Sequence, residues 1–206
     1  MHMLCLDLEG VLIPEIWLAV AARTGHKELE QTTRDMANYD ELMQHRLRVL
    51  DREGLKLPLI QDVIAGLEPL PGAADFVARM RQDFQIAILS DTFYEFAMPL
   101  MPKLGMPTLL CHRLDVDSTG RIAGYRLRQP DPKRMAVRAF QSMRYKVVAA
   151  GDSYNDVPML EEADVGIFFS APANVRADHP RFVGVDSYDG LATQIWLAAK
   201  SFASSF

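Results

Sequence analysis

The chain has 206 residues, of which 49% are hydrophobic and 24% charged, so it is long enough for one globular domain or for one domain with an insertion. A net charge of −5 leaves no basic field for nucleic acid or an anionic membrane, and no apolar run approaches the ~18 residues of a membrane span. Cys5 and Cys111 lie in apolar segments, which predicts buried, reduced thiols and, without a secretory leader, a cytoplasmic protein.

Short apolar runs alternate with stretches of helical pattern. The runs predict strands at residues 3–8, 84–90, 107–112, 146–153, 165–170 and 181–185. The amphipathic stretches predict helices at residues 72–82, 93–104, 131–143, 154–163 and 188–199. Most of the runs are apolar throughout, which is typical of strands covered on both faces. The alternation therefore predicts an α/β fold with a doubly wound, mostly parallel sheet.

Two segments break this alternation. Residues 14–66 hold no strand pattern and predict a helical block inserted directly after the first strand. Residues 113–129 predict a hairpin that closes at "DSTGR". We therefore expect an α/β core formed by residues 1–13 and 70–206, with a helical cap formed by residues 14–69.

Polar side chains collect where the predicted strands end. In an open parallel sheet, ligands bind beyond the carboxyl ends of the strands. The first, second and fourth strands and the helix that enters the fourth bring chemistry-bearing residues to this edge: Asp7, Glu9, Ser90, Asp91, Lys133, Asp152, Asn155 and Asp156. Several carboxylates around one point repel one another unless a cation lies among them, and oxygen ligands favour Mg²⁺.

These residue types suit phosphoryl transfer. A serine, a lysine and backbone N–H groups can hold a phosphate. A carboxylate beside a metal and a phosphate can attack phosphorus and form an aspartyl-phosphate. A second acid two residues further along can protonate the leaving oxygen and then deprotonate the acceptor. The pattern therefore predicts Mg²⁺-dependent phosphoryl transfer.

The same residues carry a family resemblance. The segments "DLEGVL", "LSDT", "DPKR" and "GDSYND", in this order and spacing, resemble the four motifs of the haloacid dehalogenase-like hydrolase superfamily. The helical insertion after the first motif resembles the cap of its phosphoserine phosphatase branch. The resemblance covers nearly the whole chain and implies the fold expected above.

The resemblance also implies roles for the core residues. Asp7 would be the phosphorylated nucleophile, and Asp152 the main metal carboxylate beside the Glu9 backbone carbonyl. Ser90 and Lys133 would hold the transferred phosphoryl group. Two residues of the last motif would act nearby, the first on phosphate or substrate and the second on the water shell of the metal: Asn155 and Asp156.

In the cap, Glu15 and Arg46 match the positions that bind the amino and carboxylate groups of phosphoserine, and Tyr39 would form an aromatic wall. Two positions depart from the usual pattern, with Glu9 in place of Asp and Asp91 in place of a small residue. The first lengthens the acid–base arm, and the second puts an extra carboxylate on the substrate side.

With these departures the chain resembles the members of the branch that pass the phosphoryl group to homoserine as well as to water. The resemblance thus implies small-molecule partners, phosphoserine and homoserine, with no nucleic acid and no membrane. It leaves open whether the protein is a monomer or a homodimer.

Alternatives remain for both the function and the residues. The protein could be a phosphatase for another small metabolite such as a sugar phosphate, or a silent metabolite-binding protein disabled by Glu9. Ser90 could cap the helix near Phe93, and Asp156 could order its loop. The five histidines are interpreted as structural or exposed residues, and four aromatic residues as packing residues: Trp17, Phe93, Tyr94 and Phe96.

Overall fold

The computed structural model describes residues 1–32, 36 and 38–203. In these residues one sheet of seven strands has the order β4-β3-β2-β1-β5-β6-β7, parallel except for β4, which runs antiparallel to β3. The strands are β1 (His2–Leu6), β2 (Gln85–Phe93), β3 (Thr108–Val116), β4 (Ile122–Arg126), β5 (Lys146–Gly151), β6 (Val165–Phe169) and β7 (Val183–Val185). The predicted α/β class and mostly parallel sheet are confirmed.

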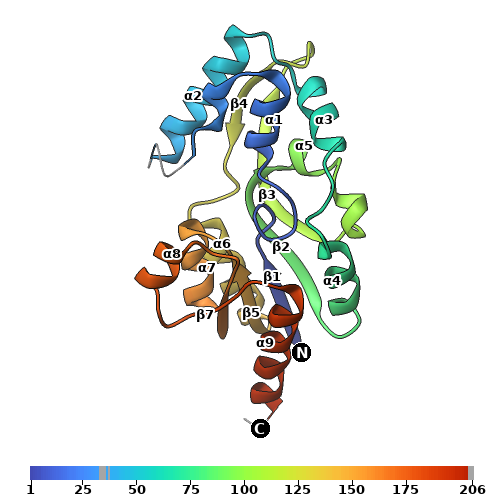
Figure 1. Ribbon diagram of the computed structural model, residues 1–206, viewed down its shortest axis with the longest axis vertical. Helices are drawn as coiled ribbons and strands as arrows, with labels where there is room; N and C mark the ends of the chain where they lie inside the picture. The colour runs from blue at the N-terminus through green and yellow to red at the C-terminus, as the bar shows by residue number, and fades with distance from the viewer. Residues whose placement is uncertain (33–35, 37, 204–206) are drawn as a thin grey trace.

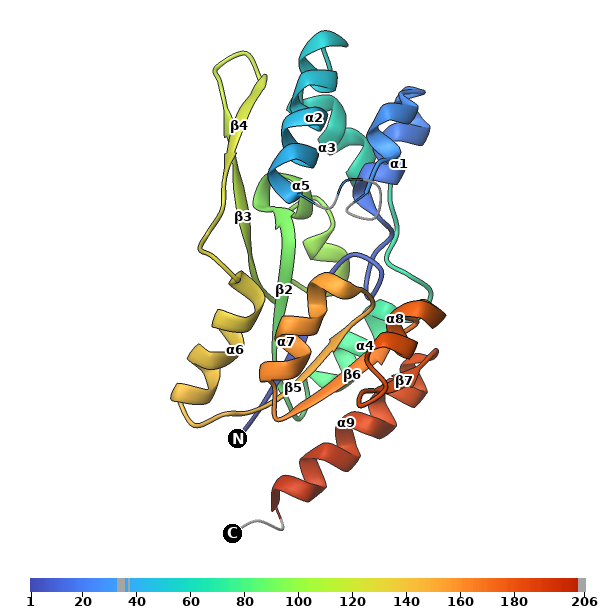
Figure 2. The ribbon, with the colours of Figure 1, turned by 90° about the vertical axis from the view of Figure 1, so that its left-hand side faces the viewer.

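Helices cover both faces of the sheet (Figures 1 and 2). The helices α4 (Ala73–Met80) and α9 (Tyr188–Ala203) pack with Leu4 and Leu6 of β1 in one apolar cluster. On the other face, α6 (Pro132–Ser142), α7 (Val157–Glu162) and α8 (Ala173–Asp178) pack with Met3 and Cys5 in a second cluster. Because successive strand residues point to opposite faces, both faces of β1 are apolar over residues 3–6.

A helical block stands beyond the carboxyl ends of the strands, at the top of Figure 1. It contains α1 (Ile16–Thr24), the 3₁₀ helix η1 (Lys27–Glu30), α2 (Tyr39–Arg52) and α3 (Leu57–Ala65). The chain enters and leaves it side by side, since the Leu70 N–H donates to the Leu12 carbonyl at 2.9 Å. The boundaries predicted after residues 13 and 69 lie next to this hydrogen bond in the sequence, and the division into core and cap stays a prediction.

The hairpin of β3 and β4 rises beside the helical block (Figure 2). Its turn closes where predicted, with the Asp117 N–H donating to the Arg121 carbonyl at 3.0 Å. At the tip, the Leu57 N–H at the start of α3 donates to the Gly120 carbonyl at 2.9 Å. The Tyr125 hydroxyl bonds to Asp40 of α2. The hairpin therefore braces the cap from the core.

One predicted helix is wrong in part. Residues 93–104 form the end of β2, the short helix α5 (Tyr94–Ala97) and the 3₁₀ helix η2 (Met101–Leu104) rather than one helix. Pro99 and Pro102 lack the N–H that a continuous helix needs, and each restricts the residue before it. Likewise, the predicted helix over 154–163 is divided into the 3₁₀ helix η3 (Tyr154–Asp156) and α7.

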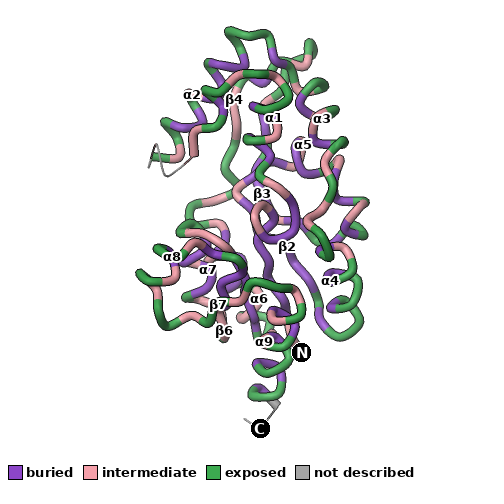
Figure 3. Tube along the Cα trace, in the orientation of Figure 1, coloured by how far each residue is buried: buried purple, intermediate pink, exposed green. Residues whose placement is uncertain are grey.

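The buried residues follow the sheet and the inner faces of its helices (Figure 3). Leu4, Leu6, Ile88 and Val148 have no exposed surface. The described residues contain no helix that is long and apolar enough to span a membrane.

Candidate active site

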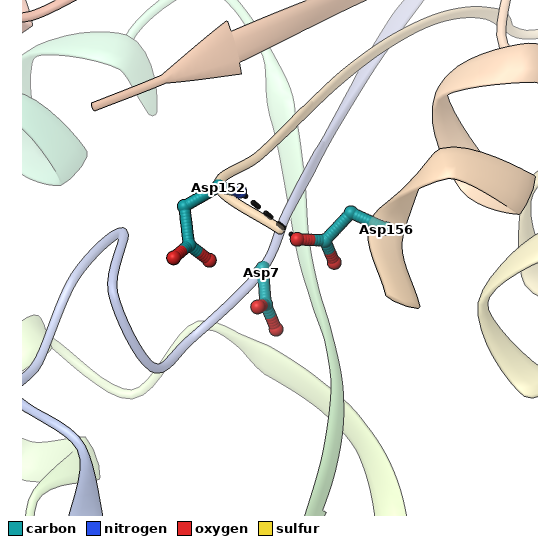
Figure 4. Close-up of side chains that lie close together, drawn as sticks. All are labelled: Asp7, Asp152 and Asp156. Carbon is teal, nitrogen blue, oxygen red and sulfur yellow. Dashed lines mark hydrogen bonds between the residues drawn. The ribbon is translucent and has the colours of Figure 1, made fainter. Parts of the chain in front are cut away.

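The acids that follow β1 and β5 meet because these strands are neighbours. Leu6 pairs with Ala150, and the Asp7 N–H donates to the Ala150 carbonyl at 3.0 Å. Carboxylate oxygens of Asp7, Asp152 and Asp156 lie within 4.8 Å of one another (Figure 4). The strand order thus brings together residues almost 150 positions apart in the sequence.

Asp156 orders the loop after β5. One of its oxygens accepts the N–H groups of Asp152 at 2.9 Å and Ser153 at 3.1 Å, and the residue has no exposed surface. A side chain at Gly151 would bring a Cβ atom within 2.3 Å of the Asp156 carboxyl carbon, so glycine is required there. The interpretation in which Asp156 orders its loop is therefore correct. The predicted role of Asp156 in the water shell of a metal ion stays a prediction.

Lys133 lies at the centre of the carboxylates. Its Nζ is 2.6 Å from Asp156 Oδ1, 2.9 Å from Asp7 Oδ1 and 3.6 Å from Asp91 Oδ2. Burial alone would lower the pKa of Lys133, but the charges of Asp156 and Asp7 raise it well above its usual value. The lysine therefore stays protonated, and the anions opposite it explain a cation in the first turn of α6.

The acidic groups outnumber this cation. Burial and the charge of Asp156 raise the pKa of Asp7 despite Lys133, and burial with the charge of Asp156 raises the pKa of Asp152 to about 7. Gly10 has φ of 76°, and a Cβ atom there would lie 2.6 Å from the Asp152 carboxylate, so the loop after β1 closely approaches this group. An excess of negative charge with only oxygen donors fits a hard divalent cation.

Glu9 joins the core to the cap. Its Oε2 accepts the N–H of Ile16, the first residue of α1, at 2.8 Å. Burial and the charge of Glu15 raise the pKa of Glu9 to about 7, although the Ile16 N–H and the Thr92 side chain lower it in part. Glu9 thus caps a helix and is also poised to gain or lose a proton near neutral pH.

A bulge in β2 turns the three residues after Leu89 toward the site. Leu89 pairs with Leu110 but Phe93 pairs with His112, so Ser90, Asp91 and Thr92 leave the regular ladder. Ser90 is 3% exposed, and its Oγ accepts the Thr92 N–H at 3.2 Å. The alternative in which Ser90 caps a helix is wrong, because α5 begins at Tyr94 with Phe93 as its cap.

Asp91 is held from several sides. Its Oδ2 accepts the Asn155 Nδ2–H at 2.9 Å, and Oδ1 lies 3.7 Å from His112 Nε2. Burial alone would raise the pKa of Asp91, but the Lys133 charge and the interactions with His112 and Asn155 hold it well below its usual value. Asp91 is therefore a carboxylate at neutral pH.

The helical block and these groups line a cavity of about 410 Å³. Arg46 is 7% exposed, and its guanidinium lies 4.5 Å from the centre of the Trp17 ring while donating to the Gln31 carbonyl at 2.8 Å. Its buried Nε has no hydrogen-bond partner among the described residues, and burial lowers its pKa to about 10. Glu15 is exposed at the cap side of the cavity.

The cavity wall brings together most of the residues predicted for the site. It is lined by Asp7, Glu9, Glu15, Trp17, Leu18, Thr32, Tyr39, Leu42, Arg46, Ser90, Asp91, Thr92, Asp152, Ser153 and Asn155. Lys133 and Asp156 lie buried behind it. Trp17, interpreted as a packing residue, packs on Phe96 with ring centres 5.4 Å apart but also forms part of this wall.

The sequence analysis assigned no site role to Thr92 or to His112. Thr92 follows Ser90 by two positions, a spacing that places both on one side of an extended strand. This spacing was available in the sequence. His112 offered no such signal, because its contact with Asp91 depends on the register of β2 against β3.

Buried carboxylates around a lysine at the switch point of a doubly wound sheet define a phosphoryl-transfer class of site. A family model described as haloacid dehalogenase-like hydrolase matches residues 2–164, and the chain belongs to this family. It is 57% identical to phosphoserine phosphatase ThrH of Pseudomonas aeruginosa over 200 residues, which cover 97% of this chain and 98% of the relative. It is 58% identical to a phosphoserine phosphatase of Pseudomonas syringae over 95% of this chain and 83% of the relative.

Solved structures share the fold. A phosphoserine phosphatase from T. onnurineus superposes with a TM-score of 0.71 at 24% identity, covering 94% of both chains. A substrate-bound phosphoserine phosphatase complex gives a TM-score of 0.74 at 17% identity, covering 95% of this chain and 97% of that one.

Proposed function

We propose that the protein is a Mg²⁺-dependent phosphoserine phosphatase that also transfers the phosphoryl group of O-phospho-L-serine to L-homoserine. The contact between Asp7 and Lys133 carries the proposal: a buried carboxylate lies 2.9 Å from a buried ammonium group at the carboxyl edge of the sheet. The relatives named above, which are more than half identical to this chain, support the choice of substrate.

In the first half-reaction, Asp7 is the nucleophile. The Leu8 N–H at 2.8 Å and Lys133 hold Asp7 Oδ1, which leaves Oδ2 to form the bond to phosphorus. The bond between phosphorus and the seryl oxygen breaks, and protonated Glu9 gives its proton to that oxygen. Ser90 and Lys133 bind the phosphoryl oxygens during the transfer.

In the second half-reaction, Glu9 acts as the base. It takes the proton of the acceptor hydroxyl, the acceptor oxygen bonds to phosphorus, and the bond to Asp7 breaks. A pKa of about 7 supports both roles, because a group that must donate and then accept a proton works best near the ambient pH. The Ile16 N–H holds one Glu9 oxygen and leaves the other for this exchange.

Asp7, Asp152 and the Glu9 carbonyl would hold the metal ion. The raised pKa values of Asp7 and Asp152 support this assignment, because burial and the charge of Asp156 leave both carboxylates without enough positive charge nearby. A bound Mg²⁺ would offset this repulsion and the charge of the incoming phosphoryl group.

The cap residues suit an amino acid. The Arg46 Nε has no hydrogen-bond partner within the described part of the chain and can donate to a carboxylate, and Glu15 supplies a negative charge for an ammonium group. Phosphoserine and homoserine share both groups, so the same contacts would orient the donor in one half-reaction and the acceptor in the other. A cap that closes fully over this cavity would limit competition from water.

The test is incubation of the protein with phosphoserine and Mg²⁺, with and without homoserine, followed by phosphorus NMR. We expect inorganic phosphate in both reactions and O-phosphohomoserine in the second. Asp7→Asn should abolish both products, whereas Asp83→Asn, an exposed aspartate at the opposite end of β2, should keep them. Full activity of the Asp7→Asn variant would refute the mechanism, and absence of O-phosphohomoserine would remove the transferase half.

A further inference from the structure

Asp91 stands between two cavities. One is the reaction cavity described above, and the other, of about 830 Å³, is lined in part by His112, Gln129, Pro130 and Asn174. Tyr39, Asp91 and Asn155 line both cavities, and the Tyr39 hydroxyl donates to the Asp91 carbonyl at 3.0 Å. This wall keeps the Asp91 carboxylate 28% exposed while fixing its backbone.

His112 approaches this carboxylate from the second cavity. The residue is 2% exposed, and its Nδ1 accepts the Arg128 N–H at 3.1 Å. A ring nitrogen that accepts a hydrogen bond carries no proton, so the proton of the neutral ring is on Nε2. Nε2 is the atom that faces Asp91 Oδ1, at 3.7 Å. The Arg128 N–H thus determines which nitrogen the carboxylate meets.

The other oxygen of Asp91 faces the phosphoryl-binding groups. It accepts the Asn155 Nδ2–H at 2.9 Å and lies 3.6 Å from Lys133 Nζ. Asn155 is exposed on a short 3₁₀ helix, and this bond ties its side chain to the β2 bulge. Asp91 is also the third anion around Lys133 and the most exposed of the three.

We propose that His112 and Asp91 form a positioning pair: the Nε2–H of His112 orients the Asp91 carboxylate, which in turn holds Lys133 and Asn155 in place for the phosphoryl group. The inference rests on the proposed phosphoryl transfer and assigns neither residue a bond to the reacting atoms. It gives a role to two residues that the mechanism above does not use.

The first test determines directly which ring nitrogen of His112 carries the proton. Nitrogen NMR of protein labelled at histidine distinguishes the Nε2–H tautomer from the Nδ1–H tautomer and from the imidazolium ion. We expect the Nε2–H tautomer for His112, with an Nε2 resonance that shifts in Asp91→Asn while the other histidines keep theirs. A proton on Nδ1, or an Nε2 resonance that does not shift in Asp91→Asn, would overturn the proposal. This result does not depend on which substrate the protein uses.

The second test is a double-mutant cycle. His112→Leu and Asp91→Asn should each lower kcat for phosphoserine about 10- to 100-fold, the loss expected when reacting groups shift by about 1 Å. The KM should change far less, because neither residue belongs to the cap. The double variant should be no slower than Asp91→Asn alone, and His112→Gln, which keeps a donor near Nε2, should recover most of the loss.

Cys111→Ala is the matched control for strand β3. Cys111 is 2% exposed and points to the opposite face, so its truncation should lower the melting temperature and leave kcat unchanged. Additive losses in the cycle, or an active and folded His112→Leu variant, would overturn the proposal. If the parent does not hydrolyse phosphoserine, the proposed function fails, and the same cycle on the affinity for inorganic phosphate decides the inference.

Discussion

Replacing Lys133 with methionine tests the electrostatic balance of the site. The substitution keeps the length of the side chain and removes the cation that lies within 2.9 Å of both Asp7 and Asp156. Removing one partner of a buried ion pair costs about 3–5 kcal/mol, because the remaining charges have no compensation. For a chain of this size that corresponds to a fall in melting temperature of about 6–20 °C.

The stability lost in Lys133→Met should depend on pH in a defined direction. Without the lysine, the pKa of Asp7, which burial and the charge of Asp156 already raise, rises further in the folded state, so the folded state binds more protons than the unfolded chain. The loss of stability is then small below the unfolded pKa of about 4, grows as the pH rises from there to the folded pKa of Asp7, and levels off above it. Urea unfolding followed by circular dichroism, with a chelator present, measures it at about pH 5 and about pH 8.

Lys146→Met is the matched control. Lys146 pairs with Asp164 at 2.7 Å at the surface, with its side chain 46% exposed, and such pairs contribute less than about 1 kcal/mol. We also expect Lys133→Met to lower kcat at least ~100-fold, the loss produced by removing one preorganised group for transition-state charge. If Lys133→Met unfolded at the same urea concentration as Lys146→Met, the view of Lys133 as the compensating charge would be refuted.

Three further predictions concern the substrate and the metal. Arg46→Ala should raise the KM for phosphoserine about 10- to 100-fold, the equivalent of a lost charged hydrogen bond; an unchanged KM in steady-state assays would favour another phosphate ester. Gly10→Ala would place a Cβ atom 2.6 Å from the Asp152 carboxylate at a φ of 76°, so calorimetry should find weaker Mg²⁺ binding, and parental affinity would contradict this. Because the pKa of Asp152 is about 7, the Mg²⁺ affinity should rise with pH up to that value and level off above it, whereas a flat profile would argue against Asp152 as a ligand.

The fold followed closely from local patterns. Apolar runs identified the strands, and the alternation with amphipathic stretches identified a parallel sheet, because both signals depend on which faces are buried. The helix over 93–104 failed where two prolines interrupt an otherwise amphipathic stretch, a local signal that was present in the sequence. The hairpin turn was located correctly, but its contact with the cap was not foreseen, since no local pattern reports it.

The candidate site also has a part that could be predicted from local sequence and a part that could not. Four candidate residues could be identified from the sequence: Asp7, Ser90, Lys133 and Asp152. Acids, a hydroxyl and a lysine at strand ends and helix starts are not explained by packing alone. The ladder shift between Leu89 and Phe93 turns Asp91 toward Lys133 and brings His112 to it, and this could not be read from either strand alone.

The amino-acid sequence by itself therefore determined which chemistry this protein carries, because residue type and spacing along one strand are local properties. Only the tertiary structure decided how the charges balance. Burial, strand order and register set the distances among Lys133, Asp7, Asp91 and Asp156, and electrostatic energies depend on those distances and on the exclusion of water.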